Sequence, residues 1–486
     1  MGKLKSLASD TIIYGFSTIL GRLLNWLLTP FYLRTIAQYD FGVVVNIYSI
    51  IAVLLVVGTL GFETGYFRFV TTQNRSKLFD SLSAGVLICG LLLTLILHFF
   101  RNSLCVWFEI TGIEGNILLI TGLIVLVDSL NSIPFAQLRF ENKSLSYAVL
   151  RFVQVIITVL FNILFLVVLK DRSYGWFHFT HEYSVFNILL ANLLGSLFIT
   201  LYFLPLFIRK QYYFGLDIFK QVFLYSLPLV GMGLFGMLNQ NIEKIILVKL
   251  VRDQDAYKSL AIYGANYKIG VLMAIFTQSF RMAFEPFFFK ESKQNENTEL
   301  YAKALKYFTL FGMLIYAGVL LFMPLVNLFL TPEYYEGNKI IPLILLGQLF
   351  FGIYYSFSIW YKVTDRTYYG IIMSFVGLTV NTVLNIWLVP SIGYMGAAIS
   401  TFVGYLTMMV ISYFLGNHYY PIHYSSMRIL MYISVIVMLV YINHFVTALY
   451  PSLWLIFACF TLIIILSVIF FSERDELKSL LKNVKR

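Results

Sequence analysis

The sequence predicts an all-α membrane protein that crosses the bilayer about fourteen times. Of its 486 residues, 59% are hydrophobic and only 12% are charged, and the mean hydropathy is +0.80. Apolar runs of about 20 residues follow one another almost from end to end, and each is long enough to span a bilayer. Soluble domains are about a quarter charged, so a soluble multidomain protein is excluded. A transmembrane barrel would need alternating segments of about 10 residues, and the sequence does not show them.

The apolar runs predict fourteen spanning helices in chain order, at 7–33, 41–69, 81–100, 114–135, 145–169, 184–208, 222–249, 259–289, 301–330, 338–362, 367–390, 392–416, 427–447 and 449–471. An even number of spans places both ends of the chain on one side of the membrane. The short basic start resembles a signal peptide, but Arg22 and Asn25 interrupt the apolar run and no small-residue cleavage site follows. We therefore expect an uncleaved first helix.

The basic residues give the orientation of these helices. Most of the 35 Lys and Arg residues fall in the connections on the same side as the chain ends. Cytoplasmic loops are enriched in Lys and Arg, so both termini are predicted to be cytoplasmic. The net charge of +11 is therefore interpreted as a topology signal, and no nucleic-acid partner is expected.

Motifs for covalent chemistry are missing from the sequence. The three cysteines (Cys89, Cys105 and Cys459) have no CxxC spacing, so neither a metal site nor a disulfide framework is expected. The chain has no P-loop and no G-x-S-x-G nucleophile elbow. No connection is long enough to fold as a nucleotide-sugar domain. We expect a protein that is not an enzyme and has no cofactor.

A weak internal repeat relates the two halves of the sequence at an offset of six helices. The basic–xxx–basic turn at Arg139–Lys143 recurs at Lys362–Arg366, and Asn162 aligns with Asn385. The first helix pair aligns with helices 7 and 8, which places Tyr48 on Tyr267 and Asn25 on Lys244. An offset of six spans preserves orientation, as in parallel repeats about an axis normal to the membrane. We expect an N-lobe at 1–210, a C-lobe at 211–418, and at 419–486 two appended helices with a basic cytoplasmic tail.

Polar residues within the spans mark the candidate site. A charge within a lipid-spanning helix costs about 2.5–3.5 kcal/mol on insertion scales, so such residues favour a watery cavity or an ion-paired interior. The residues expected to line an inter-lobe cavity and bind an anionic substrate are Arg22, Asn25, Lys244, Lys268, Gln278 and Arg281. The acidic residues assigned to ion coupling or pairing are Glu63, Glu243 and Glu285.

Other polar residues have simpler interpretations. Arg68, Glu285 and Lys290 can lie at, or extend to, the membrane interface. Asp128, Asn131 and Pro134 are interpreted as a hinge or a packing contact. Interhelical hydrogen bonds are the favoured interpretation for Asn162, Asn192, Asn381 and Asn385.

The chain resembles the polysaccharide-biosynthesis (O-antigen) flippases of the multidrug/oligosaccharidyl-lipid/polysaccharide (MOP) exporter superfamily. The residues that carry the resemblance are Gly15–Arg22 with Thr29-Pro30, Gln38–Gly42, Tyr225–Pro228, Asn239–Lys244 and Tyr263–Lys268. Where relatives often have an Asp-Arg or Asp-Lys pair in the seventh helix, this chain has Glu243-Lys244.

The resemblance implies two six-helix lobes that open alternately to each side. The implied substrate is an oligosaccharide on a polyprenyl diphosphate, moved to the outer leaflet of a bacterial inner membrane. No covalent step is needed, and a proton or sodium gradient or the membrane potential is the candidate energy source. The expected partners are this lipid-linked oligosaccharide and membrane lipids, with other polysaccharide-assembly proteins as candidates.

Two alternatives stay open at this stage. A small-molecule (multidrug) exporter of the same superfamily would favour acidic cavity residues for cationic drugs, whereas the central charges here are mostly basic. A membrane-embedded polysaccharide polymerase would need a large outer loop with catalytic residues, and no such loop is present.

Overall fold

The computed structural model describes residues 19, 21, 23, 24, 26–110, 114–174, 177–208, 213–251, 256–291, 298–358, 360, 361, 364 and 366–484. Within these residues, thirteen helices are long and apolar enough to cross a membrane. Each corresponds to one of the spans expected after the first. The first expected span, 7–33, lies mostly outside the described residues, and residues 26–35 are helical. The predicted all-α polytopic fold is confirmed.

The first half of the chain contains α2 (Gln38–Gly58), α3 (Phe62–Phe69), α4 (Arg75–Phe99), α5 (Arg101–Phe108), α6 (Glu114–Phe140), α7 (Ser144–Ile163) and α8 (Ser184–Phe207). A short π-helical segment, Leu164–Val168, extends α7. A two-stranded antiparallel hairpin, β1 (Ser173–Tyr174) and β2 (Phe177–His178), precedes α8. We call the side of the protein on which this hairpin lies the hairpin end.

The second half contains α9 (Leu216–Leu250), α10 (Ala256–Glu291), α11 (Thr298–Leu321), α12 (Met323–Val326), α13 (Ile341–Phe357), α15 (Tyr368–Ile392) and α16 (Tyr394–Tyr419). A 3-10 segment, Pro332–Ile340, leads into α13. Two further helices follow, α17 (Ser426–Leu449) and α18 (Trp454–Val484). Backbone polar groups have no water to bond in a bilayer core, and a helix satisfies them within one segment.

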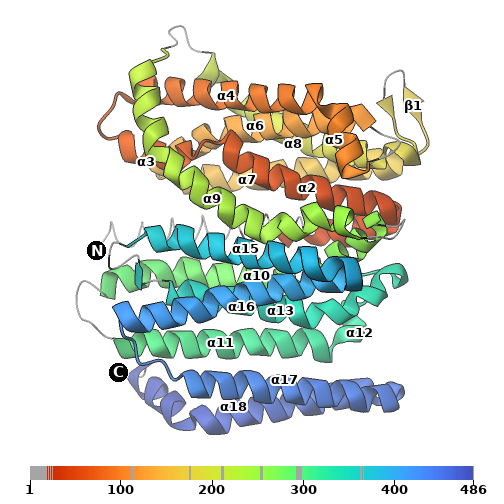
Figure 1. Cartoon of the computed structure of the whole chain (residues 1–486), viewed down its shortest axis with the longest axis vertical. Helices are drawn as coiled ribbons and strands as arrows, with labels where there is room; N and C mark the ends of the chain where they lie inside the picture. Colours follow the sequence, from red (N-terminus) through yellow and green to blue (C-terminus); the bar gives the residue numbers. More distant parts are fainter. Residues whose placement is uncertain are drawn as a thin grey trace.

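The two halves lie one above the other along the longest axis of the molecule, with α17 and α18 beyond the second half (Figure 1). In the first half α6 packs against α4 and α8, and α8 packs against α7. Six helices later the same pairings recur, because α13 packs against α11 and α16, and α16 packs against α15. This recurrence agrees with the expected parallel repeats. The exact lobe boundaries at residues 210 and 418 stay predictions.

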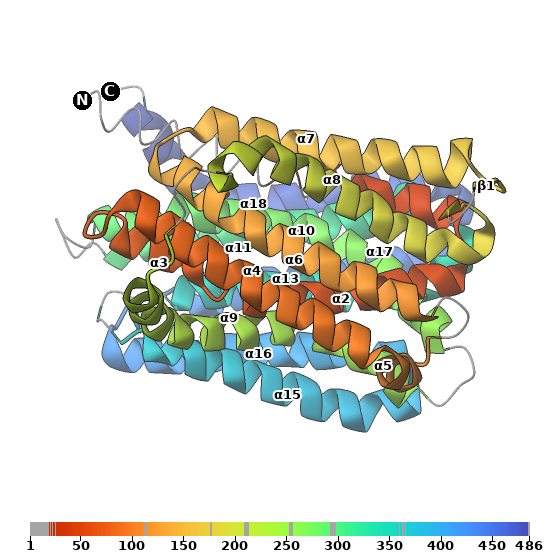
Figure 2. The same cartoon turned by 90° about the horizontal axis from the view of Figure 1, so that it is seen from above.

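Three helices bring the halves together. Helix α9 begins beside α3 and α4 of the first half and crosses to pack along α15 of the second (Figure 1). Helix α2 of the first half packs against both α9 and α10. Viewed along the long axis, the helices run roughly side by side between the hairpin end and the end where α18 finishes (Figure 2). Most helices therefore run across the membrane, and the seam between the halves is lined by α2, α9 and α10.

The seam is closed at the hairpin end. The guanidinium of Arg34 donates to the carbonyl oxygen of Leu328 at 2.6 Å, and Gln38 donates to that of Glu333 at 3.2 Å. The hydroxyl of Tyr257 donates to the carbonyl oxygen of Phe108 at 2.5 Å. These contacts tie the first half to the second at this end.

Gly42 allows the closest helix approach within this seam. A Cβ at position 42 would overlap the carbonyl oxygen of Tyr257 in α10. Only a glycine lets the α2 and α10 backbones come this close, as small residues do at many transmembrane helix contacts.

A buried ion pair holds the last two helices against the second half. The ammonium of Lys306 in α11 lies 2.5 Å from a carboxylate oxygen of Glu473 in α18. The other carboxylate oxygen accepts a hydrogen bond of 2.5 Å from Tyr432 in α17. The lysine is 3% exposed and the glutamate 2%, so the charges are shielded from lipid and water and stabilise each other. Three helices are thus joined by one polar contact.

We expect Gly42→Ala to destabilise the closed seam. Overpacking of a tight contact typically costs about 1–3 kcal/mol. The matched control is Gly231→Ala in α9, where an added Cβ meets no atom within 4 Å. The thermal unfolding midpoint in detergent should fall for Gly42→Ala and stay level or rise for Gly231→Ala. Equal midpoints for the two variants would contradict the close approach.

We expect Lys306→Met to destabilise the protein strongly, because it leaves the buried Glu473 carboxylate unpaired. Breaking a buried pair by removing one partner costs about 3–5 kcal/mol. Adding Glu473→Leu should recover most of this loss. Lys303→Met, at a partly exposed lysine of the same helix, should change stability by no more than about 1 kcal/mol. Thermal unfolding of all three variants tests this, and a double variant no more stable than Lys306→Met would refute it.

Candidate functional site

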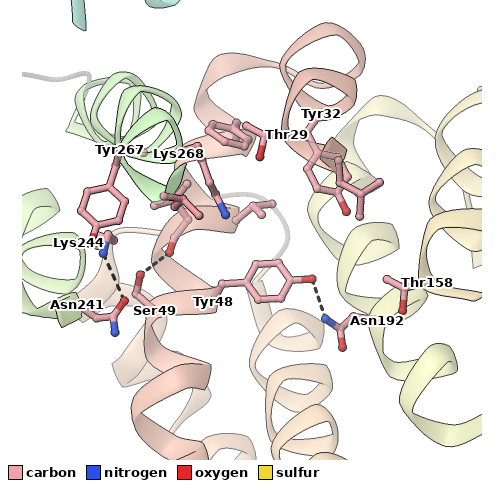
Figure 3. Close-up of a pocket in the computed structure, with 16 residues that line it drawn as sticks. Thr29, Tyr32, Tyr48, Ser49, Thr158, Asn192, Asn241, Lys244, Tyr267 and Lys268 are labelled. Carbon is pink, nitrogen blue, oxygen red and sulfur yellow. Dashed lines mark hydrogen bonds between the residues drawn. The ribbon is translucent and has the colours of Figure 1, made fainter. Parts of the chain in front are cut away.

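A cavity of about 330 Å³ lies in the seam between the two halves. Its walls come from residues 28–32 and from α2, α7, α8, α9 and α10 (Figure 3). The polar side chains that line it are Thr29, Tyr32, Tyr48, Ser49, Thr158, Asn192, Asn241, Lys244, Tyr267 and Lys268. Both halves contribute, so any change in how the halves meet changes the cavity.

Lys244 enters the cavity wall from α9 as part of a buried ion pair. Its ammonium lies 3.1 Å from a carboxylate oxygen of Glu243 and donates to the carbonyl oxygen of Gln240 at 2.8 Å. Adjacent helix positions point about 100° apart, but the long lysine side chain bends back to reach its neighbour. The same ammonium lies 4.0 Å from the centre of the Tyr267 ring, which is cation–π distance.

Glu243 lies behind this wall and is fully buried. One carboxylate oxygen meets Lys244 and accepts a long hydrogen bond of 3.4 Å from Tyr263, and the other has no hydrogen-bond partner among the described residues. Glu243 does not line the cavity. Its charge offsets that of Lys244, so this pair contributes little net charge to the cavity.

Lys268 supplies the uncompensated positive charge. Its side chain extends from α10 into the cavity, between the Tyr48 and Tyr267 sides (Figure 3). Its backbone carbonyl accepts a hydrogen bond of 2.7 Å from Trp26, which positions this turn of α10 against the first helix. The described residues provide no acidic partner for its ammonium. A free ammonium in a site of low dielectric attracts an anion more strongly than it would in water.

Tyrosines and amides make up the rest of the polar wall. The hydroxyl of Tyr48 accepts from Asn192 at 3.0 Å, and that of Tyr267 accepts from Gln348 at 2.9 Å. Tyr32 donates to Asn162 at 3.0 Å. These contacts fix the rings in place, and rigid aromatic and amide groups suit the binding of hydroxyl-rich or phosphorylated ligands.

Some of the residues expected from the sequence lie outside this cavity. Gln278 and Arg281 follow Lys268 in α10 by about 15 and 20 Å at 1.5 Å per residue, and neither lines the cavity. Arg281 instead stacks on Tyr355, with 4.6 Å between its guanidinium carbon and the ring centre. Glu63 pairs with Arg139 at 2.5 Å within the first half. Arg22, Asn25 and the side chain of Glu285 lie outside the described residues.

Eight of the ten polar cavity residues were missing from the sequence-based set, among them Tyr48, Tyr267, Asn192 and Asn241. A signal existed for three of these four. Asn241 shares a helix face with Lys244 at a spacing of three. Tyr48 and Tyr267 align with each other in the internal repeat, which places them at matching depths in the two halves. Asn192 had no signal beyond being a polar residue in a span.

The comparisons with known proteins agree with this architecture. The family model for polysaccharide biosynthesis proteins matches residues 7–292, more than half of the chain. No curated protein sequence matches the chain.

Solved transporter structures share its fold. A structure of the lipid II flippase MurJ in an inward closed conformation is similar with a TM-score of 0.75 and 16% sequence identity, covering 96% of this chain and 100% of that chain. A MOP superfamily transporter from Pyrococcus furiosus is similar with a TM-score of 0.56 and 14% identity, covering 84% and 95%. An outward-facing multidrug-resistance MATE family transporter is similar with a TM-score of 0.55 and 15% identity, covering 85% and 95%. At these identities the likeness concerns the fold alone.

Proposed function

The chain belongs to the polysaccharide biosynthesis protein family, and on this premise we propose that it is a flippase for a polyprenyl-diphosphate-linked oligosaccharide. It moves this substrate from the cytoplasmic to the outer leaflet of a bacterial inner membrane. The observation that carries the proposal is the inter-lobe cavity, lined by the ammonium of Lys268, which has no acidic partner among the described residues.

The cavity chemistry supports an anionic, hydroxyl-rich ligand. The Lys268 ammonium provides attraction for a diphosphate, and the Lys244 ammonium can exchange part of its contact with Glu243 for a phosphate oxygen. Tyrosine and asparagine side chains on the surrounding helices offer hydrogen bonds and ring faces to sugars. The polyprenyl chain stays in the lipid throughout, so only the polar head crosses between the lobes.

The closed seam supports transport by alternating access. The α2–α10 contact and the hydrogen bonds of Arg34 close the hairpin end, which positive-inside topology assigns to the outer face. In this arrangement these contacts separate the cavity from the outer face. Opening the same contacts and closing the opposite end would deliver the head group to the outer leaflet. No covalent chemistry is required at any step.

The small-molecule exporter is the second candidate, because MATE transporters share the fold. The cavity charge argues against it for cationic drugs. The Lys268 ammonium, which has no acidic partner among the described residues, repels another cation in a low-dielectric cavity, and Glu243, beside the cavity, is already paired with Lys244.

We expect Lys268→Met and Lys244→Met each to slow translocation by at least about tenfold, since loss of one charge-assisted hydrogen bond costs about 1.5–3 kcal/mol. The assay uses proteoliposomes containing a polyprenyl-diphosphate-linked oligosaccharide with a fluorescent sugar. Translocation is measured as accessibility of that sugar to a membrane-impermeant quencher.

The matched control for this assay is Lys303→Met, which removes a partly exposed lysine of α11, a helix that does not line the cavity. Its rate should equal that of the parent. Unchanged rates in both cavity variants would reject the flippase proposal. Faster efflux of a cationic dye from the Lys268→Met variant, without any glycan movement, would favour the exporter instead.

A further inference from the structure

Asp128 is an acidic residue within a spanning helix that forms no ion pair with a described residue. It lies in the central part of α6, in the first half of the chain. Three other acidic residues within the described spans, Glu63, Glu243 and Glu473, each pair with a lysine or arginine. A desolvated carboxylate without such a partner is costly in a membrane, and residues of this kind mark ion or proton pathways.

The groups around Asp128 come from α7 and α8. The amide nitrogen of Gln154 lies 3.5 Å from a carboxylate oxygen of Asp128, a long hydrogen bond, and 3.0 Å from the hydroxyl oxygen of Ser196. Ser196 and the guanidinium of Arg151 also interact with Asp128. The carboxylate is thus approached directly by neutral groups, and the nearby cation is not in an ion pair with it. Uptake of a proton removes the desolvated charge and leaves a carboxylic acid that can donate to the same hydroxyl.

The orientation of Gln154 distinguishes a proton site from a metal site. A guanidinium nitrogen of Arg151 donates to the amide oxygen of Gln154 at 3.3 Å. Because a guanidinium can only donate, this contact fixes the amide with its oxygen toward Arg151 and its nitrogen toward Asp128. A sodium ion needs several oxygen ligands, whereas here an N–H group faces the carboxylate and a cation lies behind it. The site suits a proton.

This polar cluster continues into the wall of the candidate cavity. Thr158 lines the cavity one helical turn from Gln154, and donates to its carbonyl oxygen at 3.0 Å. Asn192, which also lines the cavity, is one turn from Ser196 in α8. Tyr48 bonds to Asn192 and interacts electrostatically with Asp128. A change of charge at Asp128 therefore acts on side chains that line the cavity.

We infer that Asp128 is a proton-binding site of the first half of the chain, and that its protonation shifts the balance between the closed and open arrangements of the seam. The inference rests on the proposed function, because it assigns the ion that drives the same transporter. The step adds one proton to the carboxylate and breaks no other bond.

Other titratable or charged groups lie on the elements packed against α6. In the described residues, Arg151 of α7 and Tyr48 of α2 interact electrostatically with Asp128, and further groups on these elements include Glu63 and Arg68 of α3, Asp80, Cys89 and His98 of α4, and Cys105 of α5. Glu63 is held by Arg139, which is about 16 Å along α6 from Asp128 at 1.5 Å per residue. Glu63→Gln therefore serves as a matched control for loss of an acid in the same half.

The test measures conformation in the absence of any glycan lipid. The full-length protein, with Cys89, Cys105 and Cys459 replaced by alanine, carries spin labels on Lys170→Cys and Lys339→Cys, two exposed sites at the hairpin end in opposite halves. The distance between the labels is recorded in liposomes from acidic to alkaline pH at constant sodium concentration. We expect a pH-dependent shift in the parent, its loss in Asp128→Asn, and its retention in Asp128→Glu and Glu63→Gln.

A full pH-dependent shift in Asp128→Asn, or no shift in the parent, would overturn the inference. A shift driven by sodium at constant pH, and abolished by Asp128→Asn, would overturn the choice of ion. Thermal unfolding of Asp128→Asn, which is close to isosteric, shows that the variant is folded. The spin-label measurement contains no glycan, so it does not depend on the translocation assay. If translocation fails while the pH response of the label distance is intact, the proposed function is rejected and the proton site is not.

Discussion

The cost of placing charge in a bilayer governs the arrangement of this protein. Glu243 meets Lys244, Glu473 meets Lys306, and Glu63 meets Arg139, so most charges within the described spans are compensated where they are buried. Pairing of this kind does little for stability compared with an apolar core, but an unpaired partner is strongly destabilising. The uncompensated charges are therefore informative. Lys268 projects into the inter-lobe cavity, and Asp128 lies in a network of polar side chains behind its wall.

These two groups lie in opposite halves, and the seam connects them. Lys268 belongs to α10, whose first turns pack against α2 at Gly42, while Tyr48 of α2 faces both the cavity and Asp128. Helix α2 thus contacts the closed end, the cavity and the acidic network at once. A rigid helix in that position can transmit a change at any one of them to the other two. Transport by alternating access needs this kind of shared element, because a ligand shifts an equilibrium only through contacts that differ between the two states.

The fold could be predicted from the sequence alone, because the length of each apolar run can be measured directly along the sequence. Thirteen expected spans have counterparts in the described residues. The site was harder to predict. Lys244 and Lys268 stood out as charges in apolar runs, but so did Arg281, and α10 is 36 residues long, about 54 Å at 1.5 Å per residue. Residues on such a helix can lie at very different depths, which composition does not reveal. Tyr48 and Tyr267 align in the internal repeat, but among 34 tyrosines only the packing of neighbouring helices identifies them as residues that line the cavity.

The contact between Lys306 and Glu473 also bears on how the protein is made. The two residues are 167 positions apart, so α11 enters the membrane well before its partner helix has been synthesised. During that interval the ammonium has no Glu473 carboxylate beside it and stays near water or lipid head groups at the membrane surface. The second half can reach its final packing only when α18 arrives. Biogenesis of this transporter is therefore ordered, with late insertion of α18 completing the fold of helices inserted long before it.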